Sequence, residues 1–211
     1  MKHATTLALL VALSPVTAGA GELPFLTPTV EYSGTRVMDT AQGRMEQKLY
    51  WTPEKVRTET DFQGMKVTNI VRQDLGVMWM ANPSMPTCLE QSLDEIDDDP
   101  GLGHSDAVNA ENVEYTELGE ETIDGIQTTH YEVISRDDGK IHRAQFWVTA
   151  DNIPLKMVVE PSANDVAVTM TLEGLQRGPI DPDLFNSPGQ CMRMPAMPGM
   201  PGMPPTGSGQ P

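Results

Sequence analysis

The soft sulfur ligands of this chain gather close to its C-terminus, and their spacing is the clearest hint of chemistry. They are Cys191, Met192, Met194, Met197, Met200 and Met203. The last four methionines recur at every third position, which would place their thioethers on one face of a polyproline II helix. Thioether and thiolate sulfur select Cu(I) or Ag(I) over harder metals. The tail therefore suggests a Cu(I) site, and the alternative is a flexible Pro/Gly-rich segment whose methionines contact a partner or nothing.

The chain has two cysteines, Cys88 and Cys191. In an oxidising compartment they could close one large loop as a disulfide. The alternative is that Cys191 stays reduced and belongs to the chemistry of the tail. Sequence does not decide between them, because a disulfide needs two Cα atoms within bridging distance.

No enzyme signature occurs in the sequence. It lacks the Gly-x-Ser-x-Gly elbow, the His-Glu-x-x-His motif, a phosphate-binding glycine loop and a dinucleotide fingerprint. Beyond the N-terminal segment the histidines are His104, His130 and His142, which form no cluster typical of metal coordination. We therefore expect a protein that is not an enzyme and that has no cofactor other than the Cu(I) that the tail could bind.

The charge balance narrows the choice of partners. The formal net charge is −16, from 30 acidic and 14 basic residues. Binding of nucleic acid requires a basic patch, so nucleic acid is excluded as a partner. An acidic surface is compatible with solubility, with cation binding or with docking of a basic protein.

The N-terminus has the layout of a secretory signal peptide. Lys2 precedes an apolar run over residues 4–16, and the small residues 18–20 suit signal peptidase. No cysteine follows this segment to carry a lipid, and no later stretch is long enough for a transmembrane anchor. We expect a periplasmic or secreted protein with a signal peptide at 1–20, a linker at 21–28, one domain at 29–187 and a disordered Met/Pro/Gly-rich tail at 188–211.

The domain is expected to be mainly β. Asp124-Gly125 and Asp138-Gly139 lie between alternating runs, and Asp-Gly suits the two positive φ angles of a type I′ hairpin turn. A turn centred on Asp138-Gly139 pairs Thr129 with Val148, Tyr131 with Phe146 and Val133 with Ala144, and on the other face His130 with Trp147 and Glu132 with Gln145. The apolar pattern selects the same register independently.

Two further segments qualify this picture. Both faces of the strand around Val77 and Trp79 are apolar, so the strand needs cover on each side, from a helix or from a ligand. Leu89, Leu93 and Ile96 recur at helical spacing and predict a short amphipathic helix. In total we expect about nine to eleven strands and one or two short helices, arranged as a strongly curved antiparallel sheet.

Several short motifs resemble those of the LolA/LolB-type lipoprotein-carrier superfamily, and more closely an uncharacterised periplasmic branch of it with a domain of unknown function. They are residues 119–125 (GEETIDG), 130–133 (HYEV), 146–148 (FWV), 153–156 (IPLK), 183–185 (DLF) and the strand 55–59 (KVRTE). The resemblance spans roughly residues 29–188. It implies a half-open β-barrel, partly covered by a helical lid, around a hydrophobic cavity that holds acyl chains or another apolar ligand.

On this basis we expect a periplasmic protein that binds a lipid or another apolar small molecule. The side chains expected to line the cavity are Trp51, Val77, Trp79, Tyr131 and Phe146, with ordinary core packing as the alternative for each. Two other functions stay open: capture of Cu(I) or Ag(I) by the tail, and binding of a basic envelope protein as an accessory factor.

Overall fold

The structure is a computed structural model, and it describes residues 23, 25, 27–40, 43–62, 64–95, 113–137, 140–161 and 167–193. Within these residues the chain forms twelve β-strands and three short 3₁₀ turns. The strands are β1 (Tyr32–Thr40), β2 (Gly43–Thr52), β3 (Lys55–Phe62), β4 (Met65–Arg72), β5 (Val77–Ala81), β6 (Cys88–Ser92), β7 (Val113–Ile123), β8 (Ile126–Asp137), β9 (Lys140–Val148), β10 (Pro154–Val159), β11 (Val168–Arg177) and β12 (Cys191–Arg193). The 3₁₀ turns are η2 (Gln73–Leu75), η3 (Leu93–Glu95) and η6 (Pro182–Phe185).

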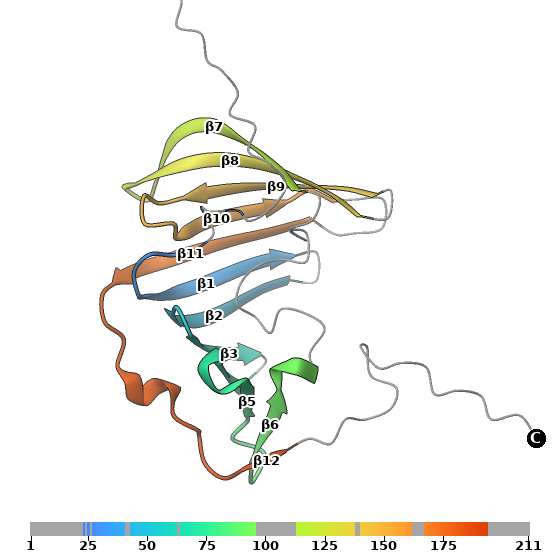
Figure 1. Cartoon of the computed structure of the whole chain (residues 1–211), viewed down its shortest axis with the longest axis vertical. Coiled ribbons are helices and arrows are strands. Elements are labelled where there is room, and N and C mark those ends of the chain that lie inside the picture. Colours follow the sequence, from blue (N-terminus) through green and yellow to red (C-terminus); the bar gives the residue numbers. More distant parts are fainter. Residues whose placement is uncertain are drawn as a thin grey trace, which may run out of the picture.

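All twelve strands belong to one curved sheet in the order β12-β6-β5-β4-β3-β2-β1-β11-β10-β9-β8-β7 (Figure 1). Two meanders, β1–β6 and β7–β11, join where β1 pairs with β11. Every pairing is antiparallel except that of β12 with β6. Because β12 and β7 end the order without pairing with each other, the sheet is an open, half-barrel-like wall. The curved antiparallel architecture expected from the sequence is confirmed, with twelve strands rather than nine to eleven.

The hairpins follow the expected turn chemistry. Asp124 and Gly125 have φ angles of 49° and 80°, so both occupy the left-handed region that a type I′ turn requires. The β8–β9 pairing has the predicted register, with Tyr131 opposite Phe146 and His130 opposite Trp147. The Asp138-Gly139 turn itself lies outside the described residues.

The predicted helix around Leu89 is wrong. Residues Cys88–Ser92 form β6, and only Leu93–Glu95 turn as a 3₁₀ segment, while Ile96 lies outside the described residues. β6 pairs with β5 on one side and β12 on the other, so its backbone groups are satisfied by two strands. These tertiary pairings outweigh a helical spacing that rested on three apolar residues. Among the described residues no helix is long and apolar enough to cross a membrane.

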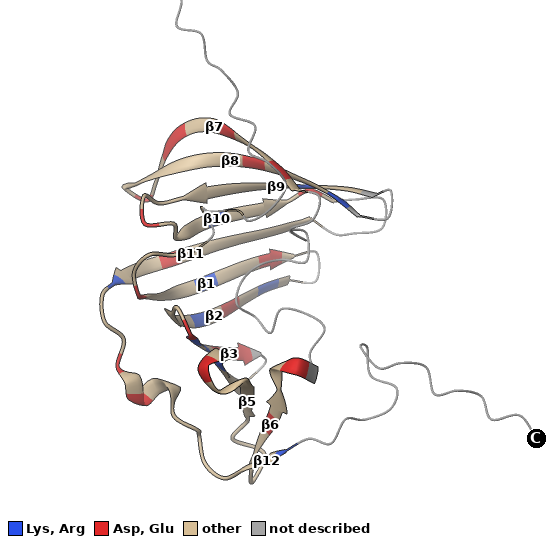
Figure 2. Cartoon of the chain, in the orientation of Figure 1, with Lys and Arg blue, Asp and Glu red and all other residues tan. Residues whose placement is uncertain are grey.

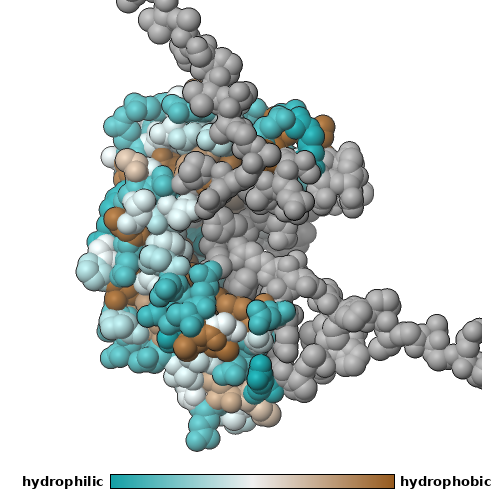
Figure 3. Space-filling model, viewed as in Figure 1, coloured by the Kyte–Doolittle hydropathy of each residue, from teal (hydrophilic) through white to brown (hydrophobic). Residues whose placement is uncertain are grey.

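The core consists of three groups of buried side chains. The first group lies on β7–β11. The second is centred on β1–β4 and the start of β10, and the third lies beneath η6. On the described surface seen in Figure 3, hydrophilic residues predominate and hydrophobic ones form separate patches. The apolar side chains are therefore concentrated against the sheet rather than on its visible outside.

Candidate ligand-binding face

One face of the sheet carries apolar side chains across nearly its whole width, and we call it the inner face. In one row, each residue lies directly opposite the next on the neighbouring strand. From β8 to β2 this row is Tyr131, Phe146, Met157, Met170, Met38 and Met45. A second row, from β1 to β5, is Tyr32, Trp51, Val56, Val71 and Met78. Buried residues of the two larger clusters occupy these rows. A single sheet buries such a wide face by curving around it, so the inner face is the concave one.

The structure divides the five predicted cavity residues between the two faces. Trp51, Tyr131 and Phe146 lie on the inner face. Val77 and Trp79 do not, because Trp79 pairs with Ile70 and both pack beneath Phe185 of η6 on the outer face. The apolar cover that this strand needed on its second face is thus the C-terminal segment, and the expectation that Val77 and Trp79 line the cavity is wrong.

The N-terminal segment fills part of the inner face. Leu23 and Phe25 are only 6% and 5% exposed and belong to the cluster on β7–β11. The Phe25 ring stacks on Tyr131 with centroids 4.1 Å apart and meets the edge of Tyr115 at 5.1 Å. Burial and the nearby Glu117 carboxylate raise the pKa of the Tyr131 hydroxyl. The stretch expected to be a linker therefore contributes two side chains to the core.

A polar strip interrupts the inner face on β1–β4. Arg36 is 8% exposed, and its Nη1 donates to Oε1 of Gln47 at 3.4 Å. Gln47 Nε2 in turn donates to the Thr60 hydroxyl at 3.1 Å. On the adjoining row Thr58 lies opposite Asn69. The strip consists of these five residues.

The inner face next to the strip is apolar and buried. Tyr32, four residues before Arg36, is 4% exposed. Burial raises the pKa of its hydroxyl to about 12, against a smaller opposing effect of the Arg36 charge. A low-dielectric site of this kind strengthens any charge interaction made within it.

On the outer face an aromatic and charged cluster holds β7–β10 together. The rings of His130 and Trp147 stack at 4.2 Å, and Lys156 Nζ lies 4.4 Å from the Trp147 ring centroid. Glu121 accepts from Trp147 Nε1 at 2.8 Å and lies 3.1 Å from His130 Nδ1, while His130 Nε2 contacts Gln145. Because each of these groups has a partner, the cluster is explained by packing between strands and needs no ligand.

A cleft of about 330 Å³ opens among the polar side chains of β1–β4. Lys48, Glu59, Asp61 and Lys66 contribute to its lining. Gln47 and Thr60 of the polar strip also line this cleft. Its charges do not suit an acyl chain, so we place the candidate site on the apolar part of the inner face instead.

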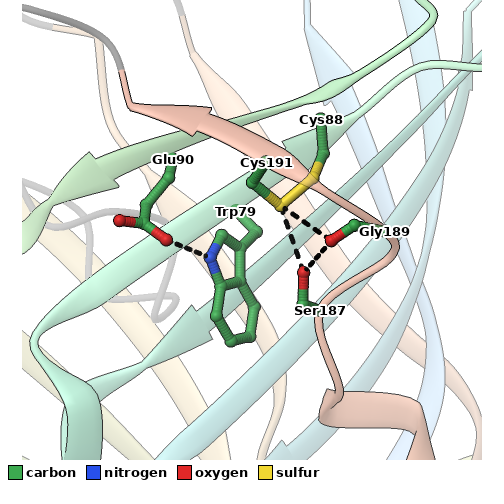
Figure 4. Close-up of a disulfide and its surroundings, with 6 residues drawn as sticks. All are labelled: Trp79, Cys88, Glu90, Ser187, Gly189 and Cys191. Atoms are coloured by element: carbon green, nitrogen blue, oxygen red, sulfur yellow. Dashed lines mark hydrogen bonds between the residues drawn. A yellow bond between two sulfur atoms is a disulfide. The ribbon is translucent and has the colours of Figure 1, made fainter.

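The C-terminal segment is fastened across the outer face and the β6 edge. A disulfide joins Cys88 to Cys191, with Cα atoms 4.4 Å apart, and brings β12 alongside β6 (Figure 4). Beside it Trp79 Nε1 donates to Glu90 at 2.9 Å. In this oxidised state Cys191 has no thiolate to offer a metal ion.

The tail residues predicted to bind Cu(I) are mostly not described. Met192 is 59% exposed, whereas Met194, Met197, Met200 and Met203 lie outside the described residues. Within the described residues no group of three or more His, Cys, Asp or Glu side chains is placed to hold a metal ion. Cu(I) binding through thioethers stays a prediction.

Sequence reasoning missed two features of the inner face. Leu23 and Phe25 were assigned to a linker, although two large apolar side chains so close together in an eight-residue stretch were a usable signal. Arg36 was overlooked, although it shares the two-residue period of Tyr32 and Met38 and thus had to point to their face.

Comparison with solved structures shows that the chain shares its fold with several proteins of known structure. An uncharacterized conserved protein of Thermus thermophilus is 13% identical with a TM-score of 0.53, and the match covers 81% of this chain and 93% of that one. MucB in complex with MucA(peri) is 14% identical with a TM-score of 0.53, and the match covers 82% of this chain and 60% of that one. The Pseudomonas aeruginosa MucA/MucB complex is 15% identical with a TM-score of 0.50, and the match covers 81% of this chain and 61% of that one. The chain thus spans about 60% of the MucB length.

The open, curved antiparallel sheet implied by the resemblance to the lipoprotein carriers is confirmed, whereas the described residues contain only short 3₁₀ segments and no lid helix. Comparison with curated proteins gave no match. The family model described as a domain of unknown function, DUF4412, matches residues 34–153, from β1 to the turn before β10. That span contains the polar strip and much of the inner face, and the chain belongs to the DUF4412 family.

Proposed function

We propose that the protein is a non-enzymatic, extracytoplasmic binding protein that shelters the apolar part of a lipid against its inner face. The observation that carries this proposal is the row of six apolar register partners from Tyr131 to Met45 in an open sheet. An antiparallel sheet with a closed core needs a second layer over such a face. Among the described residues outside the strands, Leu23 and Phe25 pack into this face, and Leu93 of η3 packs against its second cluster. The half-buried members of the row, Tyr131, Met38 and Met45, are the ones that would contact acyl chains.

The location outside the cytoplasm has independent support. The disulfide between Cys88 and Cys191 favours an oxidising compartment, since cytosolic proteins rarely keep such bonds. The predicted signal peptide agrees with it. The acidic composition also fits a protein that does not bind tightly to anionic membrane surfaces and instead carries its ligand in solution.

The test is binding of N-phenyl-1-naphthylamine, a neutral probe whose fluorescence rises in apolar sites. Met38→Glu places a carboxylate within the six-residue row and should weaken probe binding by about tenfold or more, because charge in an apolar site is costly. Thr35→Glu adds the same charge to the opposite face of the same strand and should leave binding unchanged. Equal effects of the two variants, or no binding by the wild type, would contradict the proposal.

A second candidate function is binding of a basic protein at the β7 edge. β7 is the terminal strand of the sheet, and Figure 2 shows acidic residues along it. These are Glu114, Glu117, Glu120 and Glu121. A solved relative, MucB, forms a complex with MucA. Capture of a basic peptide that weakens with salt and is lost in Glu117→Lys, while probe binding persists, would support this candidate.

A further inference from the structure

The six-residue row on the inner face has two unlike ends. At the β1–β2 end the side chains of Met38 and Met45 are half-buried. At the β8–β9 end Phe25, which precedes β1 in the chain, packs over the row and is 5% exposed. An acyl chain lying along the row would therefore meet one half-open end and one filled end.

Phe25 fills its end of the row through ring contacts. Its ring lies parallel to that of Tyr131, with an interplanar angle of 2° and centroids 4.1 Å apart. The centroid of the Phe146 ring is 6.3 Å away, and that of Tyr115 is 5.1 Å away in an edge-on arrangement. Tyr131 and Phe146 are the two members of the row on β8 and β9, so the Phe25 ring lies where the row ends.

Hydrogen bonds just after Phe25 keep it at this end of the sheet. The Thr29 backbone N–H donates to the Asp151 carbonyl at 3.0 Å, and Asn152 Nδ2 donates to the Thr27 carbonyl at 3.0 Å. Asp151 and Asn152 belong to the turn between β9 and β10. Because the two residues from Thr27 back to Phe25 span at most about 7 Å, the ring stays close to this turn.

We propose that Phe25 is a specificity-determining residue that sets how long an acyl chain the inner face accepts. The inference rests on the proposed function, because it concerns the far end of the same ligand. A chain that enters at the β1–β2 end runs along the row toward β9, and the Phe25 ring stops it there. Met157 and Met170, which lie between the two ends, are only 6% exposed. Methionine has three rotatable bonds, so these side chains can repack to admit a guest.

Removal of the Phe25 ring should lengthen the path by an amount set by the sheet. Neighbouring strands lie about 4.8 Å apart, which is the length of about four methylenes, so freeing the position over β8 admits a chain about four carbons longer. Each further methylene that becomes buried strengthens binding by about fourfold. Long chains should therefore bind more tightly to a variant that is itself less stable, whereas a purely structural role for the ring predicts weaker binding.

The experiment measures how well monoacylglycerols of increasing chain length displace N-phenyl-1-naphthylamine from the purified full chain. These lipids are neutral and have one acyl chain each. In the wild type the affinity should rise with chain length and then level off. In Phe25→Ala it should level off about four carbons later, while the affinities for shorter chains stay the same. Phe25→Leu keeps an apolar side chain in the fold and should move the plateau by fewer carbons, so it serves as the test if Phe25→Ala does not fold.

Phe185→Ala is the matched control, because it removes the same ring, 2% exposed, from the outer face. It should leave the plateau at the wild-type chain length. If the plateau stays at that length in the Phe25 variants, if those variants bind chains of every length more weakly, or if Phe185→Ala also moves the plateau, the role assigned to Phe25 is overturned and the apolar-binding function stands. If the naphthylamine probe does not bind the wild type, the proposed function falls and this inference with it.

Discussion

Replacing both cysteines tests how the C-terminal segment is secured. In Cys88→Ser/Cys191→Ser the loop between two positions 103 residues apart is no longer closed in the unfolded chain. In the chain-entropy model a loop of that length is worth about 4.7 kcal/mol at 25 °C, an upper value because unfolded chains retain structure. This loop contains β7–β11, so the bond restrains about half of the sheet when the protein unfolds.

The native state should change much less than the unfolded state. Arg57 donates to the Leu184 carbonyl at 2.9 Å, and Arg72 donates to the Phe185 carbonyl at 3.1 Å. These two hydrogen bonds hold η6 over Trp79 without any help from sulfur. We therefore expect the tryptophan emission of the double variant in buffer to match that of the wild type.

Urea unfolding followed by tryptophan emission measures the effect. With an m-value of about 2–3 kcal/mol/M, the loss of about 4.7 kcal/mol lowers the midpoint by about 1.5–2.4 M. A shift below about 0.5 M at unchanged m would refute the entropic reasoning. A red-shifted emission in buffer would instead show that the disulfide fastens the native C-terminal segment directly, and that the two arginine contacts do not suffice.

Three further predictions concern single side chains. Phe25→Ala should lower the free energy of unfolding by about 3 kcal/mol in urea, because its ring is buried against Tyr131 and leaves a cavity. Gly34→Ala should cost about 1–3 kcal/mol in the same assay, since its Cβ would lie 2.9 Å from Leu172 Cδ1. Arg177 holds the pKa of the Asp151 carboxyl below its usual range, so this pair stabilises the fold above about pH 4 and is lost as the pH falls further. Asp151→Asn should thus cost up to about 1 kcal/mol at pH 7 and flatten the pH dependence of the melting temperature below about pH 4.

Matched variants separate these effects from general damage. Met65→Ala removes an exposed apolar side chain and should cost far less than Phe25→Ala. Glu114→Gln breaks an exposed pair with Arg136 and should change stability by less than about 0.5 kcal/mol. A wild-type-like Phe25→Ala would contradict the burial of the N-terminal segment, and an unchanged acid profile in Asp151→Asn would contradict the role of Arg177.

The sequence predicted strand pairing correctly where the alternation of apolar residues and the turn residues indicate the same register. The alternation of β8 and β9 gave the pairing of Tyr131 with Phe146 because a slip of one residue would turn every apolar side chain outward. The helical spacing around Leu89 misled, because three apolar residues cannot outweigh the pairing of one short strand with two neighbours.

The amino-acid sequence by itself determined the open antiparallel wall: which residues form strands, which side chains share a face, and how the strongest hairpin is registered. Only the tertiary structure decided which face is concave and what covers the other. Alternation with period two assigns residues to two faces but does not distinguish them, so Val77 and Trp79 could be placed only once η6 was seen to cover them. The same holds for the disulfide and for Arg36 among apolar neighbours, because both depend on distances between segments that lie far apart along the chain or on different strands.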